Sequence, residues 1–139
     1  MVERLNLKAL GVSAKNNKDL YNFTHPNPKV LERFPAQTGK VDVLVTCDCP
    51  EFTSLCPMTG QPDFGRLVIQ YSPKAWMVES KSLKLYLMGY RQHGAFHESC
   101  CAMVCNDLFD LLVPEWVSVE GFFMPRGGIA LKPKAVRSK

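Results

Sequence analysis

Residues 116–124 read Trp-Val-Ser-Val-Glu-Gly-Phe-Phe-Met, and this stretch narrows the choice of fold more than any other. Its β-branched and aromatic residues predict a strand, in which successive side chains point to opposite faces of a sheet. Its large apolar residues occupy both faces: Val117, Val119 and Phe123 on one, and Trp116, Phe122 and Met124 on the other. A sheet that contains this strand therefore needs cover on both faces.

The flanking sequence predicts a ββααββ order. Strands are expected at 41–46, 66–72, 116–124 and 129–131, and helices at 80–91 and 96–112. The segment 80–91 also fits a period of two, but its length and its Leu, Lys and Met content favour a helix. Two helices can cover one face of a four-stranded antiparallel sheet, which places the chain in the α+β class. The uncovered face predicts self-association, with sheet edges pairing between subunits.

Three further segments show little periodicity. Residues 1–40 are polar and contain several prolines, so we expect an irregular arm with at most one short helix. Residues 47–63 hold three prolines and a glycine, which predicts a loop, and a loop of this length in a compact domain is usually functional. The basic residues of 132–139 predict a solvated end. The whole chain, 1–139, is expected to form a single domain.

Composition excludes several classes of protein. The chain has 139 residues, of which 46% are hydrophobic and 22% charged, so it can bury enough surface to offset its ordering entropy. Its apolar stretches are too short to span a membrane, and charges interrupt the start of the chain where a signal peptide would be apolar. We therefore expect a cytoplasmic protein whose six cysteines are thiols, ligands or nucleophiles. The net charge of +4 is too mild to indicate nucleic acid.

Cys56 and Asp63 are the candidate reactive groups. A cysteine restrained by prolines, with an acid seven residues further on, can supply a nucleophile and a proton donor to one pocket. The thiolate is the reactive form, so hydroxyls and backbone N–H groups beside Cys56 would have to stabilise it. The alternative is that Cys56 is a small buried hydrophobe and that Asp63 caps a turn.

A metal site is a weaker possibility. Cys47 and Cys49 could supply two ligands, and His97 and Cys100 two more, as a tetrahedral zinc site requires. Neither pair has the spacing of a zinc knuckle, and the cysteines of 100–105 lie on or beside the apolar stripe of a helix, where free thiols pack well. We therefore expect no metal.

Two helix starts carry charged groups. Lys81 and Lys84, with nearby serines, could hold a phosphate, although lysines at this spacing more often form a solvated helix face. A buried Glu98 could accept hydrogen bonds from a planar amidine-like edge beside the aromatic residues. Alternatively, Glu98 stabilises the first turn of its helix through the helix dipole.

Four motifs together resemble a known family, the QueF-type NADPH-dependent 7-cyano-7-deazaguanine reductases. They are Cys49–Phe64 (CPEFTSLCPMTGQPDF), Val78–Tyr86 (VESKSLKLY), His97-Glu98 and Pro125–Ile129 (PRGGI). The resemblance extends over about residues 41–131. It implies the tunnelling fold, in which ββααββ units join edge to edge into a barrel. Short members of the family are similar to pairs of pentamers, hence a decamer, with active sites between subunits.

The resemblance also implies the chemistry. The nitrile of 7-cyano-7-deazaguanine is reduced by two NADPH to the aminomethyl compound, a precursor of queuosine in tRNA, and the free base rather than tRNA is bound. Cys56 would form a thioimide and Asp63 would donate the proton. The family pattern assigns the other residues as follows: Val78, Glu79, Ser80, His97 and Glu98 to the substrate, and Lys81, Ser82, Lys84, Tyr86 and Arg126 to NADPH.

Three rival functions are kept open. A related archaeal class forms an amidine on tRNA without the NADPH motif, and the complete motif at 79–86 argues against it. A GTP-cyclohydrolase-like enzyme would need zinc ligands, and a non-enzymatic zinc or RNA-binding module would need knuckle spacing or stronger charge. We also expect Cys100, two residues after Glu98, to lie near enough to Cys56 for a protective disulfide, unless it packs in the core.

Overall fold

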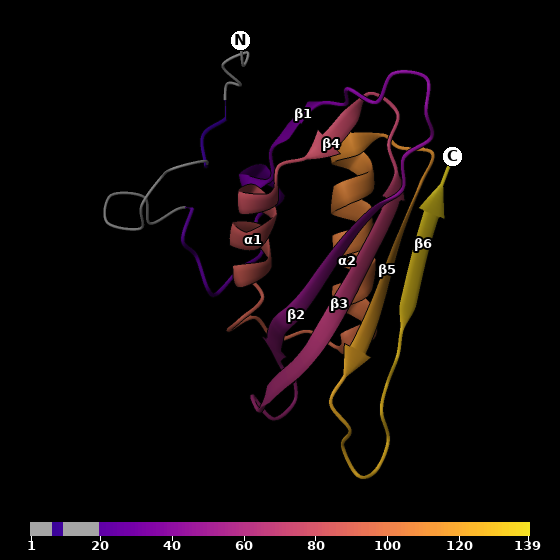
Figure 1. Ribbon diagram of the computed structural model, residues 1–139. Helices are drawn as coiled ribbons and strands as arrows, with labels where there is room; N and C mark the ends of the chain where they lie inside the picture. The colour runs from indigo at the N-terminus through magenta and orange to yellow at the C-terminus, as the bar shows by residue number, and fades with distance from the viewer. Residues whose placement is uncertain (1–6, 10–19) are drawn as a thin grey trace.

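The computed structural model describes residues 7–9 and 20–139 (Figure 1). Its elements in chain order are the 3-10 helix η2 (Pro28–Val30), β1 (Arg33–Pro35), β2 (Val45–Leu55), β3 (Pro62–Ser72), β4 (Trp76–Val78), α1 (Ser80–Met88), α2 (His97–Leu112), β5 (Trp116–Phe123) and β6 (Lys134–Ser138). The main sheet has four antiparallel strands in the order β2-β3-β5-β6, and β1 pairs with β4 in a separate two-stranded sheet. The predicted α+β class and the central ββααββ order are confirmed.

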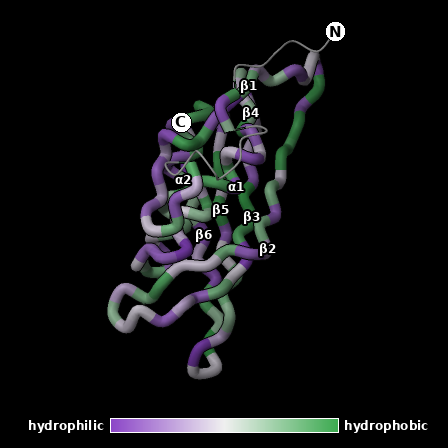
Figure 2. Tube along the Cα trace, turned by 90° about the vertical axis from the view of Figure 1, so that its left-hand side faces the viewer, coloured by the Kyte–Doolittle hydropathy of each residue, from purple (hydrophilic) through white to green (hydrophobic). Residues whose placement is uncertain are grey.

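Both helices contribute to the core on one face of the main sheet. Leu67 and Ile69 of β3 and Val119 of β5 are fully buried there, against Val104 and Leu108 of α2. In Figure 2, hydrophobic stretches recur along the helices and along the strands that they cover. The helical interpretation of residues 80–91 is correct in kind, although α1 ends at Met88. Gly89 follows it, and a side chain there would clash with the arm, because a Cβ on Gly89 would lie 2.6 Å from the Cα of Pro26.

The opposite face of the sheet carries the remaining residues of β5. Trp116 and Phe122 are half-buried, and the Arg66 guanidinium lies 5.2 Å from the Phe122 ring. Val136 of β6 is 61% exposed on this face. In the part of the chain that the structure describes, no helix packs on this side, and β2 and β6 are the two edges of the sheet. The two-faced character of 116–124 predicted from the sequence is thus present.

The predicted loop at 47–63 is wrong. Most of it belongs to β2 and β3, which form a long hairpin of two 11-residue strands. The strands accommodate Pro50 and Pro62 because neither residue stands where its backbone would have to donate a hydrogen bond to a neighbouring strand. Pro50 lies in a bulge of the edge strand between Cys49 and Phe52, and Pro62 begins β3. Apart from this bulge, the irregular part of 47–63 is the turn between the strands.

The fourth strand, predicted to start at 129–131, begins later, at Lys134, although the Leu131 carbonyl already accepts from the Phe123 N–H at 3.2 Å. The last strand is β6, within the basic segment that we expected to be a solvated end. Arg137 explains how charged residues fit this strand, because its guanidinium hydrogen-bonds Asp110 and Asn106 of α2, each at 3.1 Å. Gly127 and Gly128 have positive φ values of 57° and 77°, which allow the tight turn between Arg126 and Ile129 in the connection before β6.

The described part of the arm is more regular than expected. It contains η2 and β1, and the Glu32 carboxylate accepts hydrogen bonds from the backbone N–H groups of Lys8 and Ala9, both at 2.6 Å. The remaining residues of the predicted arm, 1–6 and 10–19, lie outside the described residues. No helix within 7–9 and 20–139 has the length and apolar character needed to cross a membrane.

Candidate active site

The turn of the β2–β3 hairpin presents Cys56. The Cys56 N–H donates to the Gln61 carbonyl and the Gly60 N–H donates to the Cys56 carbonyl, both at 2.9 Å. Gly60 has a φ of 72°, a conformation that glycine adopts without strain. Cys56 therefore stands at the start of a closed turn, half-buried rather than packed in the core.

The same turn is fixed against the segment that leads into α2. The Leu55 N–H donates to the His93 carbonyl and the Ala95 N–H donates to the Leu55 carbonyl, both at 3.1 Å. A Cβ on Gly94 would lie 3.3 Å from the Cα of Pro57, so a glycine permits the close approach. These contacts bring Cys56 and the first turn of α2 to the same end of the sheet.

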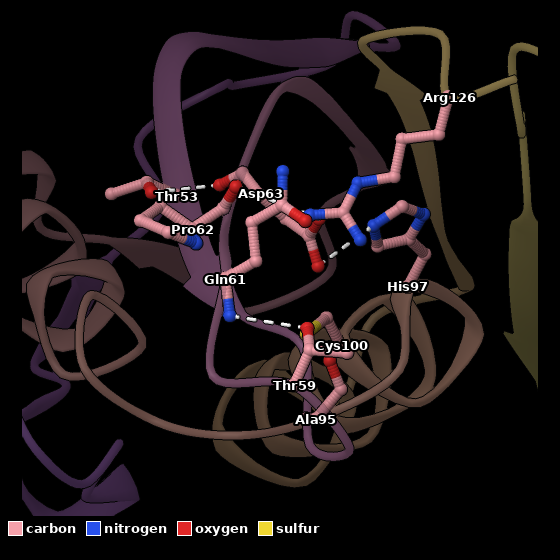
Figure 3. Close-up of polar contacts among 9 residues, drawn as sticks. All are labelled: Thr53, Thr59, Gln61, Pro62, Asp63, Ala95, His97, Cys100 and Arg126. Atoms are coloured by element: carbon pink, nitrogen blue, oxygen red, sulfur yellow. Dashed lines mark hydrogen bonds and ion pairs between the residues drawn. The ribbon is translucent and has the colours of Figure 1, made fainter.

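Asp63 is the centre of a charged cluster at that end. Its side chain is 5% exposed, and its two oxygens face different partners (Figure 3). Oδ2 lies 3.2 Å from Nε2 of His97, and Oδ1 pairs with Nη2 of Arg126. The His97 ring stacks on Phe123, with centroids 3.8 Å apart and planes within 3°. Asp63 and His97, both of which the family pattern assigned to the site, are therefore in contact.

Cys56 differs electrostatically from the other described cysteines. A hydrogen bond from the Thr59 hydroxyl, helped by the backbone N–H groups of Thr59 and Met58, lowers the pKa of Cys56 to about 7. Burial instead raises the pKa of Cys49 and of Cys100 to about 11. A large fraction of Cys56 is thus thiolate at neutral pH, and thiolates are the nucleophilic form.

The surroundings of His97 leave room for a ligand. A cavity of about 240 Å³ is lined by His97, Met124, Arg126, Ile129 and Leu131. Nδ1 of His97 is buried and has no hydrogen-bond partner among the described residues, which is costly unless a ligand or another chain supplies one. Glu98, in the first turn of α2, is exposed rather than buried as expected.

The second group of predicted residues lies at the other end of the sheet. Figure 1 shows α1 beginning beside β4, whereas the hairpin turn lies at the opposite end. A groove of about 940 Å³ runs between α1 and the free edge of β2, and Ser80 and Lys84 line it. Val78 is buried, and the Glu79 carboxylate caps α1 by accepting from the N–H groups of Lys81 and Ser82, both at 2.8 Å.

Two residues of the predicted cofactor motif are too deeply buried to contact a ligand. Ser82 is 0% exposed, and its hydroxyl donates to the Glu79 carbonyl at 2.7 Å. Tyr86 is 1% exposed, and its hydroxyl contacts Asp107 at 2.5 Å and the Tyr90 hydroxyl at 2.8 Å. Direct contact of these side chains with NADPH does not fit their burial. They hold α1 in place, and nothing in the local sequence pointed to Asp107 as their partner.

Comparisons with known proteins agree with the motifs. The family model for QueF-like protein matches residues 62–139. NADPH-dependent 7-cyano-7-deazaguanine reductase of Helicobacter pylori (strain HPAG1) is 53% identical over 133 residues, which cover 96% of this chain and 86% of the relative. The chain belongs to the QueF family. The QueF relative of Staphylococcus haemolyticus (strain JCSC1435) is 52% identical over 119 residues, which cover 86% of this chain and 70% of that protein.

A solved structure supports the QueF assignment at the level of the fold. The apo form of archaeosine synthase QueF-Like has a TM-score of 0.60, covering 68% of this chain and 91% of that one. At 18% identity this likeness shows the shared tunnelling fold alone. Within the described ranges, no group of three or more His, Cys, Asp or Glu side chains is placed to hold a metal ion.

Proposed function

We propose that this QueF protein reduces the nitrile of 7-cyano-7-deazaguanine to 7-aminomethyl-7-deazaguanine with NADPH, as a step toward queuosine. The observation that carries the proposal is the Cys56 thiol, which has a pKa of about 7 and shares the Arg126 guanidinium with a buried acid, Asp63. A chain 53% identical over most of its length carries the name of this reductase. The pairing of an activated nucleophile with an acid is what a covalent route through a nitrile needs.

The proposed chemistry begins at Cys56. A nitrile carbon accepts hydride poorly, so the thiolate adds to it first and the nitrogen takes a proton from Asp63, which gives a thioimide. NADPH supplies the two hydrides that reduce the carbon, and the thiol leaves between them. His97, whose Nε2 lies 3.2 Å from Oδ2 of Asp63, holds that carboxyl in orientation. Glu98 binds the guanine-like edge and His97 lines the ring.

The groove beside α1 fits a dinucleotide. Ser80 and Lys84 offer a hydroxyl and an ammonium group to phosphates, and Leu83 and Leu87 give the groove an apolar floor. Lys81 lies next to Ser80, in the first turn of α1. We assign NADPH to these residues, with Val78, Glu79 and Ser80 close to the substrate.

One chain does not bring the two groups of residues together. The cavity at His97 and the groove at Ser80 share no lining residue, although the groove extends along β2 as far as Thr53, whose hydroxyl donates to the Asp63 carbonyl. A second copy placed along the free edge of β2 or β6 would bring the α1 residues of one chain near the Cys56 turn of another. We therefore propose that the single domain is active as a homo-oligomer, a decamer of two pentamers, that binds the free base and no nucleic acid.

The assembly predicts a size that can be measured. Sedimentation velocity should show a species many times heavier than one chain, and activity should fall on dilution below the assembly range. Both follow if the catalytic residues come from neighbouring copies. An active species with the mass of one chain would contradict the shared site.

Glu98 predicts a loss of affinity. Glu98→Gln removes the charge from a hydrogen bond to the guanine-like edge, and charge-assisted bonds are about twice as strong as neutral ones. We expect about tenfold weaker binding of 7-cyano-7-deazaguanine by calorimetry in a Cys56→Ala background, where no covalent bond forms. Glu115→Gln, an exposed acid paired with Lys74, is the matched control. Unchanged affinity in both variants would leave Glu98 with a helix-end role.

The function itself is tested by NADPH oxidation. Adding 7-cyano-7-deazaguanine to the purified protein should consume two NADPH for each amine formed, as seen by absorbance and mass spectrometry. Oxidation that does not depend on the nitrile, or formation of an amidine instead of an amine, would overturn the proposal.

A further inference from the structure

Arg126, which the family pattern assigned to the cofactor, points at the catalytic acid instead. Its Nη2 pairs with Oδ1 of Asp63 and donates to the Pro62 carbonyl at 3.3 Å (Figure 3). It does not line the groove beside α1; it lines the small cavity at His97. The guanidinium therefore lies at the base of the hairpin turn that carries Cys56.

The backbone around Arg126 is built to aim this side chain. Arg126 and Ile129 exchange two backbone hydrogen bonds, both at 3.0 Å, which closes a tight turn. Gly127 and Gly128 make the turn possible because both have positive φ values. A Cβ at either glycine would meet nothing within 4 Å, so the glycines serve backbone conformation rather than close packing.

The charged and titratable groups that meet at Asp63 come from three elements, and one of them, Arg126, also hydrogen-bonds the Cys56 thiol. β3 supplies the Asp63 carboxyl, α2 supplies His97 and the buried Cys100 thiol, and the turn after β5 supplies Arg126. Burial raises the pKa of Cys100 to about 11, so that thiol stays neutral near pH 7. Arginine is charged at every working pH, and it therefore provides a permanent positive charge in this cluster.

We infer that Arg126 is a positioning residue for the nucleophile and the acid, and that it acts on them before substrate or cofactor binds. In the proposed reaction Cys56 and Asp63 together hold one negative charge, either as thiolate with neutral acid or as thiol with carboxylate. One guanidinium neutralises either form. The proton can then pass from sulfur to Asp63 and on to the nitrile nitrogen without leaving an unbalanced charge in a site where Asp63 is 5% exposed.

The bond changes of this step balance without a further reactant. The sulfur–carbon bond forms, one π bond of the nitrile breaks, and the thiol proton ends on the nitrogen. Arg126 exchanges no proton, and its ion pair with Asp63 is restored when the carboxylate re-forms. The inference rests on the proposed function, because it concerns the nucleophile and the acid of that reaction. The ionisation of the Cys56 thiol, however, can be measured without nitrile or NADPH.

The test is the pH dependence of alkylation. Wild type, Arg126→Gln, Arg126→Lys and the control Lys132→Gln are treated with iodoacetamide from pH 5 to 9, and labelling of the Cys56 peptide is followed by mass spectrometry. In the wild type the rate should rise with a midpoint near pH 7. In Arg126→Gln we expect the midpoint to rise by about half a pH unit, which makes labelling about threefold slower at pH 6. Arg126→Lys should fall between the two.

The control and the steady-state rates separate this role from cofactor binding. Lys132→Gln removes the same charge from the same connection and should leave the profile unchanged. In the NADPH assay, Arg126→Gln should lower kcat while KM for NADPH stays within about twofold. A profile of Arg126→Gln identical to wild type, with KM for NADPH raised, would overturn the inference and return Arg126 to the cofactor. If Arg126→Gln does not fold, a profile of Arg126→Lys unchanged from wild type would overturn it equally.

Discussion

Cys56→Ala should abolish nitrile reduction and leave the fold intact. Cys56 is at a half-exposed turn that main-chain hydrogen bonds close, and the main donors to its sulfur, Met58 and Thr59, are exposed to water. The loss of sulfur therefore removes the nucleophile without opening a cavity in the core. Cys56→Ser should be as inactive, because a hydroxyl is far less acidic than a thiol and stays protonated at neutral pH. Circular dichroism and thermal unfolding should be unchanged in both.

The covalent step can be observed directly in the wild type. With 7-cyano-7-deazaguanine and no NADPH, mass spectrometry should find an adduct on the peptide that contains Cys56. Because only the thiolate attacks, adduct formation should be slow below pH 6 and rise as pH passes about 7, the pKa of this thiol. Cys49→Ala is the control, since burial raises the Cys49 pKa to about 11. An adduct on Cys49 would refute the assignment.

Asp63→Asn should have the second largest effect. An amide cannot give up a proton as a carboxylic acid does, and general acid catalysis is worth about 10²–10⁴-fold. We expect kcat to fall by about that factor while calorimetric binding of the substrate is retained. Asp110→Asn, which removes an exposed partner of Arg137, controls for the loss of a carboxylate from an ion pair. Turnover within a few-fold of wild type would show that Asp63 is structural.

The sequence predicted the elements whose pattern is decided locally. The two-faced strand at 116–124 and the apolar stripe of 96–112 correspond to β5 and α2 within a residue or two. Both carry strong periodicity, and Pro114 ends the helix in both descriptions. The α+β class followed from these elements and their order.

The errors arose where tertiary context overrides composition. Prolines at 50 and 62 predicted a loop, but the edge strand β2 tolerates Pro50 at a bulge, and the inner strand β3 tolerates Pro62 as its first residue. The basic C-terminal segment predicted a solvated end, but Arg137 of β6 hydrogen-bonds Asp110 of α2. Neither the edge position of a strand nor a partner 27 residues away can be read from a local window.

The sequence predicted which residues belong to the candidate site better than it predicted the role of each residue. The motif around Cys56 and Asp63 has a long, specific pattern, and the structure places both residues at one end of the sheet. Glu79 and Ser82 lie in an equally specific motif, yet their polar atoms satisfy the start of α1. A motif indicates that a residue is needed for the fold or for the function. It does not say whether the side chain faces a ligand or the backbone.

The contact between Tyr86 and Asp107 constrains how the enzyme could turn over. It ties α1, which lines the cofactor groove, to α2, which carries His97, through buried hydroxyls. Tyr90 extends the link to Phe52, and Phe52 to Phe123, beneath the His97 ring. The two helices are therefore linked through the core by contacts that a relative movement would break. In the proposed reaction a spent cofactor must leave before a second one enters, and this exchange then depends on the surface connections and on the contact between copies, while the helices keep the reacting groups aligned.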